Sequence, residues 1–194
     1  MDGGNDRKIG NGRTATASKK TISLSRHRNG MNILDVNIIN QLAPYGVRLE
    51  EGQYRFHTDY DIAYIVDFER EDLFDEVPAY WFGIVNRSHL PSPNDPKVRA
   101  TIICIIEEFF HKNPDILLYM CDSADDQQAM RNRLFIRWFN GYDQQKLYAI
   151  ETAMILDENI ETYVAIIIQR SNPHLDSILE QFHKQIEMFQ ENKP

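Results

Sequence analysis

Cysteine and long apolar runs are both scarce in this chain of 194 residues. Its two cysteines, Cys104 and Cys121, each lie within an apolar run. This setting favours reduced, buried thiols over a disulfide framework, a metal site or a nucleophile. No stretch approaches the length of a membrane span, and the first 30 residues lack the apolar centre of a secretory signal. We therefore expect a cytoplasmic protein.

Several sequence motifs of enzymes are also missing. The six histidines show no H-x-x-x-H or H-E-x-x-H spacing, so the common zinc-hydrolase pattern is absent and we predict no metal site. The chain has neither a G-x-S-x-G elbow nor a Walker loop. His89 could act as a base, but a surface histidine is the simpler interpretation. No pattern in the sequence identifies a catalytic residue.

Positive charge is scarce outside the amino-terminal tail. The formal net charge is -8, and residues 1–30 hold seven Lys or Arg against two Asp, or +5, which leaves -13 for residues 31–194. An acidic body repels phosphate backbones, so nucleic-acid binding is disfavoured except through the tail. The tail is rich in Gly, Ser and Thr, which predicts disorder. We predict a disordered tail over residues 1–30 and a single domain over 31–194.

Apolar periodicity predicts alternating helices and strands in that domain. Asp95 is suited to cap a helix, Pro96 to its first turn, and Asn113-Pro114 to its end. The expected elements are a helix from Met31 that stops before Pro44, strands near 54–56, 64–68 and 80–85, a helix over 96–112, a strand over 116–121, a helix over 125–139, strands over 147–156 and 163–169, and an amphipathic helix from 172–173 onward.

This order predicts an α+β (mixed α/β) fold. The helix over 96–112 is a crossover, so the strands on either side of it should be parallel, whereas hairpins at both ends favour antiparallel flanks. We expect a single mixed sheet of about five to six strands with helices on its faces. The C-terminal amphipathic helix should dock on this domain or pair with a partner.

The stretch ILLYMCDSADDQQAMRNRLFIRWF, residues 116–139, contains the candidate binding residues. Asp122 and Asp125 lie where the strand ends and the next helix begins, where carboxylates cap exposed amides. Arg131, Arg133 and Arg137 follow on the expected helix. They could present a cationic face to carboxylates or to a nucleotide, or they could form structural ion pairs.

Two resemblances follow from these residues. The runs DPKVRATIICIIEEFF, LLYMCDSADDQQAMRNRLFIRWF and YVAIIIQRSNP resemble an uncharacterised bacterial family, known as a domain of unknown function, over about residues 50–190. That resemblance implies no activity. The element order of residues 31–169 also resembles the GCN5-related N-acetyltransferases.

The acetyltransferase resemblance implies a cofactor loop that this sequence lacks. In that family the helix after the fourth strand opens with Q/R-x-x-G-x-G/A, whose amides hold the acetyl-CoA pyrophosphate. The corresponding NRSHLPSPNDPKVRA has no glycine, and Asp95 places a negative charge where phosphate would lie. The family's usual tyrosine acid has no match between Asp125 and Phe139.

Two function classes therefore stay open. The first is a non-catalytic binding or regulatory module that needs no cofactor and recognises a protein partner or itself, through the Arg-rich helix or the final helix. The alternative is a divergent acyl-CoA-dependent N-acyltransferase, which would bind acetyl-CoA. These sequence features do not decide whether the protein is an enzyme.

Overall fold

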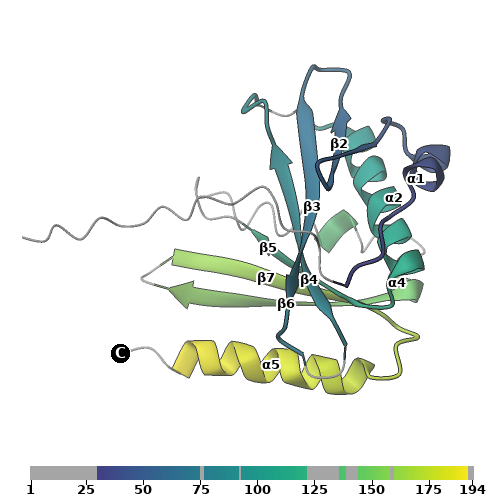
Figure 1. Cartoon of the computed structure of the whole chain (residues 1–194). Helices are drawn as coiled ribbons and strands as arrows, with labels where there is room; N and C mark the ends of the chain where they lie inside the picture. The colour runs from purple at the N-terminus through teal and green to yellow at the C-terminus, as the bar shows by residue number, and fades with distance from the viewer. Residues whose placement is uncertain are drawn as a thin grey trace, which may run out of the picture.

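The computed structural model describes residues 30–74, 77–91, 93–121, 136–138, 144–157 and 160–191. Within these residues a single mixed sheet of seven strands is covered by helices on both faces (Figure 1). The elements are α1 (Val36–Leu42), β1 (Arg48–Glu50), β2 (Gln53–His57), β3 (Ala63–Glu71), β4 (Ala79–Asn86), α2 (Pro96–Lys112), β5 (Ile116–Cys121), α4 (Gln144–Leu147), β6 (Tyr148–Asp157), β7 (Ile160–Gln169) and α5 (Leu175–Glu191).

The strand order is β1-β2-β3-β4-β5-β7-β6. Only β4 and β5 pair in parallel, across the α2 crossover, and every other described neighbour pair is antiparallel. The predicted α+β class with one mixed sheet is confirmed. The sheet has seven strands rather than five to six because the sequence pattern does not reveal β1. Its three residues are all exposed, so they show no apolar alternation.

The helix α2 has the ends that the sequence predicts. The Asp95 side chain accepts a hydrogen bond from Lys97 N, Pro96 is the first helical residue, and Asn113 N donates to Phe109 O at 2.8 Å. The first helix, in contrast, begins at Val36 and not near Met31. Asp35 is its N-cap and accepts from Asn37 N, so the buried Met31 and Leu34 precede the helix.

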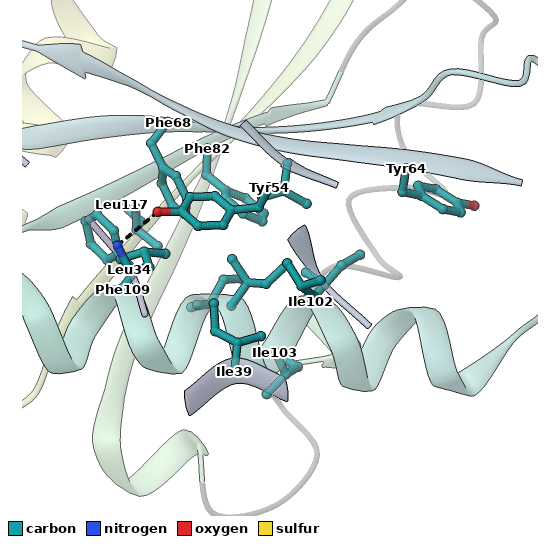
Figure 2. Packing of buried hydrophobic residues seen from close by; sticks show 14 of the residues in the cluster. Leu34, Ile39, Tyr54, Tyr64, Phe68, Phe82, Ile102, Ile103, Phe109 and Leu117 are labelled. Carbon is teal, nitrogen blue, oxygen red and sulfur yellow. Dashed lines mark hydrogen bonds between the residues drawn. The ribbon is translucent and has the colours of Figure 1, made fainter. Parts of the chain in front are cut away.

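One face of the sheet packs against α2, with α1 on the outer side of α2 (Figure 1). Aromatic residues fill this core, including Tyr54, Phe68 and Phe82 from the sheet and Phe109 from α2. Phe68 and Phe109 stack with ring centroids 5.1 Å apart. Figure 2 shows these rings between the sheet and α2, together with the hydrogen bond that Leu34 N donates to the buried Tyr54 hydroxyl at 2.9 Å.

The opposite face packs against α5, which runs alongside β6 and β7 (Figure 1). Ile178 and Phe182 of α5 are buried against Val164, Ile166 and other apolar residues of the sheet. The amphipathic pattern of the last helix therefore serves docking within the chain, one of the two uses that the sequence predicts. Among the described residues, no helix has the length and apolar character needed to span a membrane.

The helix expected over residues 125–139 lies mostly outside the described residues. Residues 136–138 are described and are helical. Trp138 is partly buried against the core on the α2 side of the sheet.

Candidate functional site

Four of the five candidate binding residues, Asp122, Asp125, Arg131 and Arg133, lie outside the described residues. The fifth, Arg137, is exposed. Next to it, Arg99 of α2 donates from Nη2 to Trp138 O at 2.8 Å, which fixes residues 136–138 beside α2. Arg137 thus lies on the α2 side of the sheet, and the cationic face around it stays a prediction.

The amino end of α2 is closed by side chains of the protein itself. Asp95 accepts at Oδ1 from Lys97 N (2.9 Å) and at Oδ2 from the Tyr45 hydroxyl (2.6 Å). Asp59 N donates to the same hydroxyl at 3.3 Å. The amides and positive dipole of this helix end are therefore already matched by a carboxylate.

An exposed ion pair completes this arrangement. Lys97 Nζ lies 2.6 Å from Asp59 Oδ2 and 5.5 Å from the centroid of the Tyr45 ring. The hydrogen bond from Lys97 lowers the pKa of Asp59, while burial and the bond to Asp95 raise the pKa of Tyr45. The cluster of Tyr45, Asp59, Asp95 and Lys97, hereafter the α2 cap cluster, holds two carboxylates and one ammonium group: Lys97 pairs with Asp59, and the Asp95 carboxylate is held by hydrogen bonds alone. An incoming phosphate would meet the Asp95 carboxylate.

The sequence pattern identifies Asp95 but not its partners in the α2 cap cluster. Tyr45 is 50 positions away in the chain. No spacing rule relates residues at that separation, because only the packing of α1 and the following loop against α2 brings them together.

A second polar contact also joins α1 to α2. The Glu108 side chain is buried and accepts at Oε1 from Asp35 N (3.1 Å), while His111 Nδ1 lies 3.0 Å from Oε2. Glu108 thus satisfies the start of α1 and the end of α2. This contact gives Glu108 a structural role.

The parallel strands β4 and β5 part after a short pairing. Their register ends at Phe82 opposite Tyr119. Beyond this point β4 stays beside β3 as far as Asn86, and β5 stays beside β7 as far as Cys121. The rings of Phe82 and Tyr119 lie 6.3 Å apart on the α2 side. The pairing of β4 with β5 therefore covers only part of each strand.

The outer side of β6 and the neighbouring surface of α5 form another candidate. His183 Nε2 lies 2.5 Å from Glu151 Oε2, and Gln190 Nε2 donates to Met154 O at 3.1 Å. A hollow of about 550 Å³ follows α5 and is lined by Asp176, Leu179, Glu180, His183, Lys184 and Glu187. Within the described part of the chain, no three His, Cys, Asp or Glu side chains are grouped to hold a metal ion.

The comparisons with known proteins match part of the chain to one family and indicate no activity. No curated protein matches the chain. Residues 94–184 match the model of a family of unknown function, DUF6169. The match runs from just before α2 into α5 and contains the three runs that carried the first resemblance. Residues 94–184 are therefore similar to a family whose function is unknown, as predicted.

Proposed function

We propose that the protein is a non-catalytic binding or regulatory module that recognises a protein partner. One observation carries this proposal: the amino end of α2, where an acyl-CoA enzyme of similar element order needs open amides, is closed by Asp95 and Tyr45. The carboxylate repels phosphate, and Pro96 offers no amide donor there.

Closure of the amino end of α2 should reduce the binding free energy of a cofactor phosphate by an amount that is large compared with ordinary cofactor affinities. Each charge-assisted hydrogen bond to a pyrophosphate is worth about 1.5–3 kcal/mol. Binding at this helix end would forfeit several of them or would first have to break the Asp95–Tyr45 and Asp95–Lys97 hydrogen bonds. A chain that interacts through its surface needs no such rearrangement.

A cytoplasmic location is part of the same proposal. Cys104 is a free thiol, and burial raises the pKa of its side chain. A thiol of that kind is kept in the reduced state most readily in a reducing compartment.

A divergent N-acyltransferase is the second candidate, and the parting of β4 and β5 favours it. In the acetyltransferases that this element order resembles, the gap between the corresponding strands holds the cofactor. A divergent enzyme could retain that gap and have lost the usual phosphate loop.

Titration calorimetry of the full chain with acetyl-CoA separates the two candidates. We expect no heat at millimolar cofactor, either for the unchanged chain or for Asp95→Asn, which keeps the helix cap and removes the charge. Saturable binding by the unchanged chain would overturn the proposed function. Binding by Asp95→Asn alone would show that the carboxylate is what blocks a phosphate site.

A further inference from the structure

The strand β6 forms one edge of the sheet, and no described strand pairs with its outer side. Arg170, just after β7, donates from its backbone N to Leu147 O at 2.8 Å. The backbone N–H and C=O of Leu147 therefore point toward the β7 side and not toward the outer edge. Backbone direction alternates along an antiparallel pair. The outward groups therefore belong to Tyr148, Ile150, Thr152, Met154 and Leu156. The bond from Gln190 of α5 to Met154 O agrees with this assignment.

Apart from the Gln190 side chain, which covers Met154 O and would have to give way to a new strand, this edge lacks the features that usually prevent strand addition. Protected edges are short, charged or interrupted by proline. The opposite edge, β1, has three residues, two of which are Arg48 and Glu50. In contrast, β6 has ten residues without proline or lysine, and Glu151 is the only charged residue before Asp157. Met154 and Leu156 are 41% and 46% exposed beside it.

We propose that a second copy of this chain pairs with β6, antiparallel about Thr152, so that two sheets become one. In this register, the side chains on the α2 side of the edge pair with uncharged side chains of the other copy. Thr152 faces its own copy, Ile150 faces Met154, and Tyr148 faces Leu156. Apolar cross-strand pairs of this kind stabilise antiparallel ladders.

The charges of β6 argue against one of the two neighbouring registers, the one centred on Met154. Pairing about Thr152 places Glu151 opposite Ala153. Pairing about Met154 would instead place Glu151 opposite Asp157, and like charges directly across a ladder are destabilising. The one carboxylate inside the edge therefore disfavours a two-fold axis at Met154, and the apolar pairs over the full length of β6 favour the axis at Thr152.

The helix α5 adds charge complementarity to the same axis. His183 contacts Glu151, and Gln190 contacts Met154, so α5 follows β6 in the same direction. Thr152 lies between these two contacts, so an axis through it passes beside α5 at the level between Lys184 and Glu187. Both side chains are exposed and line the hollow along α5. Each Lys184 then lies beside the Glu187 of the other copy.

A second copy suits this surface because every contact is self-complementary, as a two-fold interface requires. Residues 31–194 hold 14 Lys or Arg against 27 Asp or Glu, a net charge of -13, so two copies repel each other over most of their surfaces. The edge of β6 is nearly neutral, and Lys184 of one copy can form an ion pair with Glu187 of the other. This inference rests on the proposed function and names the partner as the chain itself.

Sedimentation velocity of the full chain tests the edge. We expect a dimer, and a monomer for Thr152→Pro, because proline removes an outward N–H that the new ladder needs. The thermal midpoint of the monomeric variant should stay close to that of the unchanged chain at low concentration. Thr152→Val keeps the N–H and should stay dimeric.

A charge exchange tests the register. Lys184→Glu creates two repulsive contacts per dimer and should weaken association about tenfold. Lys184→Glu combined with Glu187→Lys recreates both pairs and should restore the original affinity. An unchanged affinity for the single variant, or no recovery in the double variant, would overturn the register.

A monomeric chain at millimolar concentration, or a dimer that persists in Thr152→Pro, would overturn the edge pairing. Both results leave the proposed function in place, since binding could then use another surface or partner. Binding of acetyl-CoA would overturn the proposed function without changing the sedimentation result.

Discussion

At the scale of single residues, Asp95 shows how one carboxylate can act in two ways. It caps α2 through Lys97 N and also holds the buried Tyr45 by accepting from its hydroxyl. The same side chain thus connects the segment after α1 to α2. Removing it should cost stability as well as change the charge at the helix end.

We predict that Asp95→Ala lowers the free energy of unfolding by about 1–2 kcal/mol, because the α2 cap is lost and Tyr45 loses its acceptor. Urea denaturation measures the change. Asp95→Asn retains a side-chain oxygen for Lys97 N and should cost clearly less. Equal losses in the two variants would show that charge, and not capping, is what Asp95 contributes.

A buried tyrosine predicts a stability change at alkaline pH. Burial first, and the charge of Glu107 second, raise the pKa of Tyr148 from 10.0 to about 12. The folded state therefore keeps this proton where the unfolded chain loses it. The stability from Tyr148 is fully present below pH 10 and is lost as the pH rises toward 12.

We predict that Tyr148→Phe makes the protein less sensitive to pH in this window, by about 1–2 kcal/mol between its two ends. Urea denaturation below pH 10 and near pH 12 provides the comparison. Tyr60→Phe, at an exposed position, should leave the pH dependence as it is. A parallel pH dependence of Tyr148→Phe and the unchanged chain would contradict the prediction.

At the scale of elements, α2 and α5 differ in what holds them in place: local capping residues for α2, and packing against the sheet for α5. The helix α2 has its N-cap and C-cap in its own sequence. The helix α5 has strong amphipathicity, and its register on the sheet is set by Ile178 and Phe182. A substitution at either residue should therefore undo docking rather than the helical pattern itself.

We predict that Phe182→Ala, at a side chain that is 2% exposed, lowers the free energy of unfolding by about 3–5 kcal/mol. The cost combines lost apolar burial with a cavity between α5 and the sheet. Phe189→Ala is the matched control, because that ring is 55% exposed on the same helix and should change stability by less than about 0.5 kcal/mol. Similar losses at both positions would contradict the docking described for α5.

At the scale of the whole molecule, the negative charge of residues 31–194 causes repulsion between copies of the chain. Long-range repulsion between two bodies of net charge -13 is screened by salt within about 10 Å at 0.1 M. The proposed interface is mainly a backbone ladder with apolar pairs, and these contacts depend little on salt.

We predict that the dimer tightens as salt is raised from low to physiological ionic strength, since screening removes repulsion between the bodies. Sedimentation equilibrium in a salt series measures this trend. The Lys184→Glu, Glu187→Lys double variant has the same net charge and should follow the same trend. Dissociation by salt would instead indicate an interface held by ion pairs.

Local patterns along the chain predict the types of most elements. The polar residues at the ends of α2, the apolar run of β5 and the amphipathic stripe of α5 each lie within a short stretch. The parallel pairing of β4 and β5 also follows, because a crossover helix separates them. The strand β1 is exposed throughout and carries no periodic signal, and the predicted start of α1 is wrong because Met31 and Leu34 are buried outside the helix.

By itself, the sequence determined the α+β class, the acidic body and the absence of a phosphate loop, because these depend on composition and on neighbours along the chain. Only the tertiary structure decided that Tyr45 closes the α2 cap cluster, that β7 lies between β5 and β6, and that β6 becomes an edge beside His183 and Gln190. These relations join residues far apart in sequence. They arise from packing and strand pairing, for which no local pattern exists.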